Sequence, residues 1–418
     1  MVKRIVAIIL IFLCTSVAWG ILGATIFTRT YSSDDRLSDR VVSIWGAPQR
    51  QTPPSASFEQ LVPKTTETVV NGKTVTQTVK ESVTVPLLLE ASRVDVSLAL
   101  DHRQKGLLWY STYKVAFSGV YTFRNPSDKK QEVNFKLDYP ASQAIYDDLV
   151  FTVDDAPVAL TNEQKAAHAT AAVGPGQAAT LRVAYNSQGL DEWRYGFGGD
   201  VAQVKDFVLR MRTDFDGIDF PENALSPSEK RETGDGWELE WAYKNLVSGF
   251  EIGMTMPEKL QPGPLAGRIS FFAPVSLFFF FFLMFIITTM RGIELHPMNY
   301  FFLAAAFFAF HLLLAYLVDH VSIHVAFVAC SAVSIFLVVS YLRLVTGMRF
   351  ASGEAAFAQF IYLVMFSYAF FFKGFTGLAV AVGSIITLFV VMQLTGRVNW
   401  AEKFAPKTAN NEPKSASI

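Results

Sequence analysis

Long apolar runs fill the last third of the chain, from residue 269 to residue 395, and only short polar breaks separate them. The first run, residues 269–290, contains five consecutive phenylalanines from Phe278 to Phe282. A helix that is apolar on every side has no face for water, so this run predicts a membrane helix. Crossing about 30 Å of hydrocarbon takes roughly 20 apolar residues in a helix. Four more runs are close to this length: residues 299–318, 322–344, 355–372 and 375–395.

A sixth apolar stretch begins close to the N-terminus. Lys3 and Arg4 precede residues 5–27, which are almost all apolar. The apolar core of a cleavable signal peptide is about 7 to 15 residues long, so this longer stretch favours a retained anchor. The chain is therefore predicted to have six membrane helices.

Between the anchor and the first long run, apolar and polar residues alternate with a period of two. Asn71-Gly72 lies between two alternating segments, residues 67–70 and 74–85, and indicates a hairpin with a type I′ turn. Other predicted strands are residues 93–100, 113–123, 132–139, 149–153, 180–185, 205–213 and 237–243. The one stretch with any helical period is around residues 162–172. Many short alternating strands with regular turns indicate a β-sandwich, and one solvated face per sheet fits antiparallel pairing.

These patterns predict a membrane protein of α+β class. The expected parts are an N-terminal membrane anchor over residues 1–28, a periplasmic β-sandwich-like domain over 29–267, a five-helix membrane domain over 268–396 and a cytoplasmic tail over 397–418.

The distribution of basic residues predicts the orientation in the membrane. Arg291, Arg343, Arg349 and the basic residues of the tail fall on the side that also holds Lys3 and Arg4. Lys and Arg are enriched in cytoplasmic loops. Both termini are therefore expected in the cytoplasm, with the β domain on the opposite side, the periplasm of a Gram-negative cell.

Composition excludes several classes of function. The chain has 418 residues, 51% of them hydrophobic, and a formal net charge of −1. This balance gives no basic field to attract nucleic acid. The two cysteines, Cys14 and Cys330, fall inside predicted membrane helices, so the β domain has no disulfide and no thiolate metal site.

Several short motifs resemble the CreD family of bacterial inner-membrane proteins. They are Leu295-His296-Pro297-Met298-Asn299-Tyr300, Val318-Asp319-His320, Tyr341-Leu342-Arg343 and Gly396-Arg397-Val398-Asn399-Trp400, with Ser43-Ile44-Trp45-Gly46-Ala47-Pro48-Gln49 and Gln104-Lys105-Gly106-Leu107 nearer the N-terminus. The resemblance is strong over residues 291–400 and weaker over the β domain, least of all over residues 189–230. It implies an inner-membrane location and a role in cell-envelope integrity, linked to colicin tolerance and to a two-component system. It implies no enzymatic mechanism and no cofactor.

Two places could carry chemistry within the membrane part. Asp319, His320 and His324 form the one cluster that resembles a set of Zn²⁺ ligands. They lie at a predicted connection between helices, where polar residues are expected in any case, so loop and helix capping is the favoured interpretation. His311 lies deep inside a predicted helix, where an ionisable residue suggests a proton relay or a substrate contact. A neutral histidine bonded to a neighbouring helix explains it equally well, and Gln359 and Gln393 are the other buried polar residues expected there.

The sequence therefore predicts a non-enzymatic inner-membrane protein that supports envelope integrity or a stress response. Its expected partners are the lipid bilayer and periplasmic or envelope proteins, with no nucleic acid, no catalytic residue, no metal and no cofactor. The alternative is a transporter or membrane-embedded enzyme that acts through the helical bundle, centred on His311 or on Asp319, His320 and His324.

Overall fold

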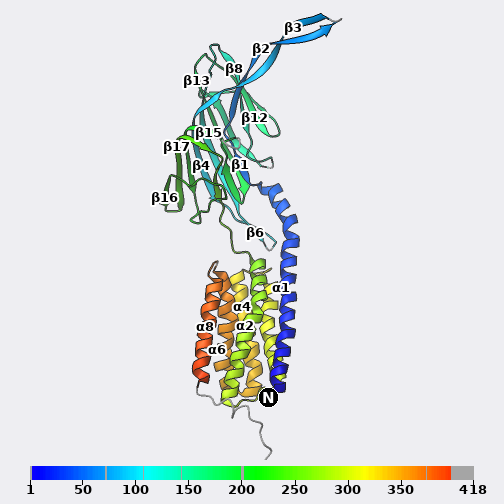
Figure 1. The fold of residues 1–418 in the computed structure, drawn as a ribbon. Helices are drawn as coiled ribbons and strands as arrows, with labels where there is room; N and C mark the ends of the chain where they lie inside the picture. The colour runs from blue at the N-terminus through cyan, green and yellow to red at the C-terminus, as the bar shows by residue number, and fades with distance from the viewer. Residues whose placement is uncertain are drawn as a thin grey trace, which may run out of the picture. The chain divides into compact units, whose positions relative to one another are not determined.

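A computed structural model describes residues 2–70, 73–106, 108–142, 144–198, 202–372 and 374–396. The chain divides into two compact units. One unit, here called the β domain, comprises Arg36–Lys105 and Trp109–Lys259. The other, here called the bundle, comprises Met1–Asp35, Gly106–Leu108 and Leu260–Ile418. Figure 1 shows the strands and helices of both units. The domain boundaries drawn from the sequence stay predictions.

The described part of the β domain contains one large sheet of eight strands. In spatial order they are β10 (Ala156–Pro157), β9 (Tyr146–Val153), β13 (Ala178–Leu190), β7 (Thr112–Arg124), β4 (Leu88–Leu100), β15 (Ala202–Thr213), β17 (Gly236–Ser248) and β16 (Glu229–Thr233).

Smaller sheets complete the described strands. A five-stranded sheet has the order β11 (Leu160–Asn162), β12 (Ala166–Val173), β8 (Gln131–Asp138), β2 (Ser55–Val70) and β3 (Lys73–Pro86). A three-stranded sheet has the order β1 (Gln49–Gln51), β14 (Glu192–Tyr195) and β18 (Ile252–Thr255), and β5 (Arg103–Lys105) pairs with β6 (Leu108–Tyr110).

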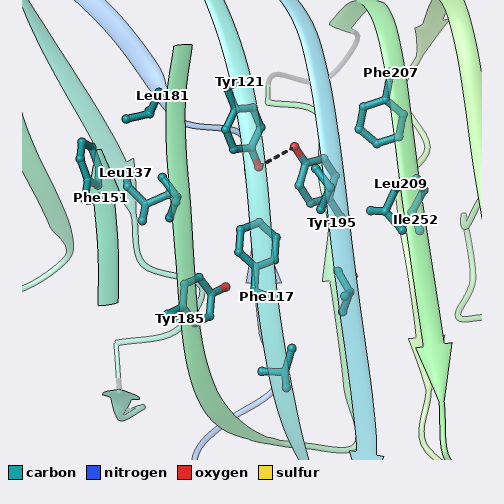
Figure 2. Packing of buried hydrophobic residues seen from close by; sticks show 14 of the residues in the cluster. Phe117, Tyr121, Leu137, Phe151, Leu181, Tyr185, Tyr195, Phe207, Leu209 and Ile252 are labelled. Carbon is teal, nitrogen blue, oxygen red and sulfur yellow. Dashed lines mark hydrogen bonds between the residues drawn. The ribbon is translucent and has the colours of Figure 1, made fainter. Parts of the chain in front are cut away.

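The period-two alternation determines which face of each strand is buried. Val133, Phe135 and Leu137 of β8 have no exposed surface, and the charged and polar residues between them point outward. Rings meet across the sheets: Phe123 of β7 lies 5.9 Å from Phe135 of β8, and Tyr195 of β14 lies 5.7 Å from Phe207 of β15. Figure 2 shows this interior, with side chains of several strands filling the space between the sheets. The predicted sandwich is therefore confirmed.

The predicted hairpin is present as a long pair of strands. β2 and β3 pair antiparallel from Ser57 opposite Pro86 to Val70 opposite Lys73. The Asn71-Gly72 turn itself lies outside the described residues.

Two expectations about the β domain were wrong. Residues 162–172 are not helical but form the end of β11 and most of β12, which pairs with β8. Alanine favours helix in isolation, and packing of alternate residues such as Ala169 and Val173 in the core overrides that preference. Pairing is also not antiparallel throughout, because β4 and β15 run parallel in the large sheet. Parallel neighbours need a long connection, and more than 100 residues separate these two strands.

The apolar runs form helices of the bundle, and the first of these helices continues past Asp35 into the β domain. They are α1 (Val2–Trp45), α2 (Pro262–Arg291), α3 (Pro297–Leu317), α4 (Ile323–Thr346), the segment Met348–Phe371 and α8 (Thr376–Thr395). Within the described residues, six helices are long and apolar enough to cross a membrane. This agrees with the six helices predicted from the sequence.

Helix α1 continues well beyond its apolar part. The anchor predicted from hydropathy ends near residue 28, but the helix runs on through polar residues to Trp45. Hydropathy reports which residues tolerate lipid and not where a helix ends. The helix stops before Gly46, whose φ of +107° is a conformation that other residues rarely adopt. A Cβ at Gly46 would also lie 2.3 Å from the carbonyl oxygen of Gln188.

Gly236→Ala should lower the free energy of unfolding of the β domain by about 1–3 kcal/mol, because overpacking strains the backbone. Gly236 is buried at the start of β17, where a Cβ would lie 2.2 Å from the carbonyl oxygen of Thr213. The obstacle is backbone, which cannot rotate away. Resistance of the full chain to protease during heating measures the effect. Gly234→Ala is the control, since nothing lies within 4 Å of its added Cβ; equal loss in both variants would contradict the prediction.

Candidate functional site

His311 on α3 is a polar group inside the bundle, and its side chain has no exposed surface. Its Nδ1 lies 3.1 Å from the carbonyl oxygen of Phe307. Because a carbonyl only accepts, Nδ1 carries the proton and Nε2 is left as an acceptor. Neither His311 Nε2 nor the indole Nε1 of Trp19 has a hydrogen-bond partner in the described part of the chain. The two rings pack edge to face with centroids 5.7 Å apart, so α1 covers the histidine with an aromatic ring.

A second buried polar group links three helices. The amide Nε2 of Gln359 donates to Ser334 Oγ on α4 over 2.7 Å. Ser334 Oγ in turn donates to the carbonyl oxygen of Ala306 on α3 over 2.6 Å. Gln359 Oε1 is buried and has no partner among the described residues. The Gln359 amide N–H and the Ser334 hydroxyl both have hydrogen-bond partners within the protein. This explains how these polar side chains are tolerated in an apolar bundle.

The fifth membrane segment, Met348–Phe371, is an irregular helix. Two stretches, Ala351–Ala355 and Phe360–Met365, are wound as π-helix, and α6 (Ala356–Gln359) lies between them. Such π-turns are rare and occur often at functional sites. Here they flank Gln359, so this residue is positioned by the irregularity. Hydrophobic patterning contains no signal for a π-turn, and the sequence analysis missed it.

The cluster Asp319, His320 and His324 is not assembled as a metal site. Asp319 Oδ1 lies 3.3 Å from Arg29 Nη2 of α1, and Arg29 Nη2 also donates to the carbonyl oxygen of Ala315 over 2.6 Å. His320 is exposed, and the ring of His324 packs against Phe371 at 5.2 Å. Among the described residues no group of three histidine, cysteine or carboxylate side chains could hold a metal ion. The role of Asp319 is an ion pair between α1 and the end of α3.

The histidine before α3 has a structural role. His296 is the N-cap of α3, and its Nδ1 accepts from the backbone N–H of Met298 at 3.3 Å. Pro297 follows at the first position of the helix, which suits a helix start. Asn299 in the same motif accepts a hydrogen bond from the Tyr341 hydroxyl at 2.8 Å. Two motifs that are distant in sequence thus hold α3 and α4 together.

Small residues four positions apart on α4 and α8 pack within the bundle. Ala326, Cys330 and Ser334 on α4 are fully buried. On α8, a Cβ at Gly383 would lie 2.7 Å from the ring of Phe366, and Thr387 accepts a hydrogen bond from Tyr362 at 2.9 Å.

Helices α1 and α2 approach closely through glycines. A Cβ at Gly23 would lie 2.9 Å from the ring of Phe271, and one at Gly267 would lie 2.8 Å from the ring of Phe27. A Cβ at Gly263, one turn before Gly267, would lie 2.6 Å from Thr30 Oγ1 of α1. Gly263 and Gly267 form the small-xxx-small spacing that lets membrane helices meet. This signal was present in the sequence but was not recognised.

The polar interior of the β domain is built from tyrosine hydroxyls. Tyr121 and Tyr195 share a hydrogen bond of 3.3 Å, drawn in Figure 2, and the Tyr185 hydroxyl donates to Gln51 Oε1 over 2.6 Å. Burial raises the pKa of Tyr121, Tyr185 and Tyr195. These hydroxyls therefore stay protonated at neutral pH and serve as hydrogen-bonding groups, not as bases.

An ion-pair network lies on the small three-stranded sheet. Arg50 Nε of β1 donates to Glu251 Oε1 over 2.6 Å, and Arg194 Nη1 of β14 lies 3.7 Å from the other carboxylate oxygen of Glu251. The hydrogen bond to Glu192 raises the pKa of Arg194. Gly198, in the glycine-rich stretch that follows β14, has a φ of +111°. Gly199 lies outside the described residues.

Comparison with known proteins gives one family and a set of distant folds. The sequence profile described as "Inner membrane protein CreD" matches residues 223–401. No curated protein sequence matches the chain.

Solved structures show only remote likeness. A protein from Legionella pneumophila, described as a candidate nutrient-binding protein, has a TM-score of 0.34 at 10% identity and covers 56% of this chain and 76% of its own. A variant of the M1 zinc metallopeptidase from Deinococcus radiodurans has a TM-score of 0.25 at 10% identity and covers 40% of this chain and 42% of its own. The chain thus spans less than half of the metallopeptidase.

Proposed function

This chain is a member of the CreD family of inner membrane proteins over residues 223–401, and we propose that it supports the integrity of the cell envelope without catalysing a reaction. It is a multi-pass membrane protein with helices in contact with the bilayer. In the proposed role, the β domain meets periplasmic or envelope proteins, and the bundle holds it at the membrane.

The observation that carries this proposal is the double attachment of the β domain. α1 leads directly into β1, and β18 leads into α2 within a few residues. A domain inserted between two membrane helices is held near the membrane by both of its ends. That arrangement suits a sensor or a scaffold, which acts where it is anchored.

The orientation proposed for the chain follows from charge. Arg291 ends α2 and Arg343 lies in the last turn of α4, at the same side of the membrane as the start of α1. Under the positive-inside rule this side is cytoplasmic. Both termini are then cytoplasmic and the β domain is periplasmic.

A second candidate function is favoured by the unpaired polar atoms inside the bundle. His311 Nε2, Trp19 Nε1 and Gln359 Oε1 are buried and have no partner within the described residues. Such atoms are costly in an apolar environment unless water or a substrate binds them. A transporter or membrane-embedded enzyme would use them for this purpose.

Complementation of a deletion strain separates the two functions. The full chain should restore resistance to detergent and exclusion of a DNA-binding dye, and a chain without residues 48–257 should restore neither. His311→Ala and Gln359→Ala should retain at least half of the protection, with the exposed His320→Ala as the matched control. All variants are compared at equal abundance in the membrane fraction.

Two results would contradict the first candidate. One is protection by the chain that lacks the β domain. The other is loss of protection in His311→Ala or Gln359→Ala while His320→Ala protects fully, which would support a reaction or transport step inside the bundle.

A further inference from the structure

Strands β2 and β3 form a two-stranded ribbon, here called the ribbon, that leaves the rest of the five-stranded sheet. β2 pairs with β8 from Ser55 to Ser57, and it pairs with β3 from Ser57 to Val70. Figure 1 shows the two strands running on together past the other strands of the β domain. Residues 59–65 and 78–84 are all exposed. Two strands alone are only marginally stable in water, so a third strand would stabilise the ribbon.

The register of the ribbon determines which backbone groups of β3 point away from β2. The N–H of Leu87 donates to the carbonyl oxygen of Ala56 over 2.8 Å, and the next pair toward the turn is Pro86 opposite Ser57. Hydrogen-bonded and non-hydrogen-bonded pairs alternate along an antiparallel ladder. Odd-numbered residues of β3 therefore bond to β2, and the N–H and C=O groups of even-numbered residues point outward. Within the described residues β3 has no second neighbouring strand.

The two edges of the ribbon differ in their protection against an added strand. On β2 the residues that point away from β3 are odd-numbered and include Pro63, which has no N–H and interrupts pairing at that edge. On β3 the exposed outward-pointing residues all carry an N–H, and they are Thr78, Lys80, Ser82 and Thr84. These donors recur about every 6.8 Å along the strand. Another extended backbone presents acceptors at the same spacing, so an extended strand is the ligand that fits this edge.

One face of the ribbon is apolar and continues the core of the β domain. Val62 lies opposite Glu81 in the register. Val79 and Val83, two residues to either side of Glu81, are therefore the diagonal neighbours of Val62 on β3. These three valines are 40–49% exposed, and Phe58, at the base of the same face, belongs to the buried core. A strand added beside β3 would cover the valines with apolar residues at every second position.

The opposite face of the ribbon carries a cation at the open edge. Lys80 is exposed and has no ion-pair partner among the residues that the structure describes, whereas Glu81 on the other face is paired with Lys64 at 2.8 Å. The residue opposite Lys80 on an added strand should therefore be acidic, because opposite charges across a ladder attract. A second copy of β3 would place this same face beside Lys80, and its other described residues are uncharged: Thr78, Ser82 and Thr84. A different sequence fits the edge better than a second copy does.

We propose that the open edge of β3 binds an extended segment of a partner protein as a third strand of the ribbon. The backbone of that segment bonds to the outward groups of Thr78, Lys80, Ser82 and Thr84. Its side chains alternate between apolar residues beside the exposed valines and polar residues, with an acidic residue opposite Lys80. Main-chain bonds give such a complex its affinity, and alternate side chains give it specificity. This inference rests on the proposed function, since it names the surface through which the β domain meets another envelope protein.

Binding of a synthetic peptide to the full chain tests the edge directly. The probe is a fluorescent peptide of alternating valine and threonine with one central aspartate, and its anisotropy is followed as full-length protein in mild detergent is added. The same peptide N-methylated at every residue cannot donate to the ladder and should not bind. Lys80→Pro removes an outward N–H of β3 and should weaken binding about tenfold or more. Leu61→Pro removes an outward N–H from the β2 edge and should leave binding unchanged.

A charge reversal tests the side-chain part of the proposal. Lys80→Glu should bind a peptide with a central lysine more tightly than the aspartate peptide by about threefold or more, whereas the parent should show the opposite preference. Protease resistance of the full chain during heating shows whether each variant keeps its fold. If Lys80→Pro is degraded faster than Leu61→Pro, the charge reversal and the N-methylated peptide decide the question instead.

Several results would overturn the proposal. They are binding of the N-methylated peptide as tightly as the probe, no binding of the probe at millimolar concentration, and binding that a folded Lys80→Pro variant leaves unchanged. A doubled mass in detergent that Lys80→Pro abolishes would also overturn it, because a second copy of the chain would then occupy the edge. The proposed function fails on a different result, protection of cells by the chain without the β domain, so the two failures are distinguishable.

Discussion

Replacing Trp241 by alanine should lower the free energy of unfolding of the β domain by about 3–5 kcal/mol, the usual cost of removing a buried aromatic ring. Trp241 on β17 has no exposed surface and belongs to the main core. Its indole N–H also donates to the carbonyl oxygen of Leu225 over 2.9 Å. The substitution removes both the packing and the contact that holds the irregular segment before β16.

Two control variants separate these contributions. Trp241→Phe keeps most of the ring and loses the hydrogen bond, so it should cost about 1–2 kcal/mol. Trp237→Ala removes a partly exposed tryptophan four residues earlier on the same strand and should cost less than Trp241→Ala. Protease resistance of the full chain across a urea series measures all three without relying on tryptophan fluorescence. The prediction is wrong if Trp237→Ala is the more damaging change.

Gly267→Val should separate α1 from α2 and lower bundle stability by about 1–3 kcal/mol, because an added side chain has no space there. A Cβ at Gly267 would lie 2.8 Å from the ring of Phe27, and two more carbons would extend farther into the contact. In lipid the helices associate through close packing, so this contact is not replaced by a hydrophobic driving force.

The matched control for this substitution is Gly20→Val on α1. Gly20 has nothing within 4 Å of an added Cβ and lies on the same helix as Phe27. Melting of the full chain in detergent should shift to lower temperature for Gly267→Val and stay within about one degree of the parent for Gly20→Val. A shift of equal size in both would mean that general disturbance of the helices, and not the glycine contact, sets stability.

The elements that the sequence predicted well are those with strong periodicity. Val133, Phe135 and Leu137 alternate with charged residues, and the pattern alone placed them in the core. The six apolar runs were equally clear, because no soluble fold explains them. The polar end of α1 had no such signal, since residues 29–45 of that helix have neither an apolar face of sufficient width nor a long apolar run.

The candidate sites were harder to predict because their partners are far apart in sequence. Asp319 was placed beside His320 by proximity along the chain, but its actual partner, Arg29, is 290 residues away. His311 was identified from its depth in a helix, and its contact with Trp19 required knowing where α1 packs. Gln359 was recognised as polar and buried, whereas its position between two π-turns depends on backbone geometry that residue types do not encode.

The small three-stranded sheet determines how mechanical load enters the β domain. β1 follows α1, β18 precedes α2, and both strands pair with β14. Gln49, the first residue of β1, lies opposite Trp193, and Thr255, the last residue of β18, lies opposite the neighbouring Glu192. A pull on either connection therefore acts at the end of β14 that holds Glu192 and Trp193. The backbone hydrogen bonds of this sheet would break one after another from that end. β14 is thus the strand on which load from both connections meets, and the Arg50–Glu251 ion pair adds a contact between the two outer segments of this sheet.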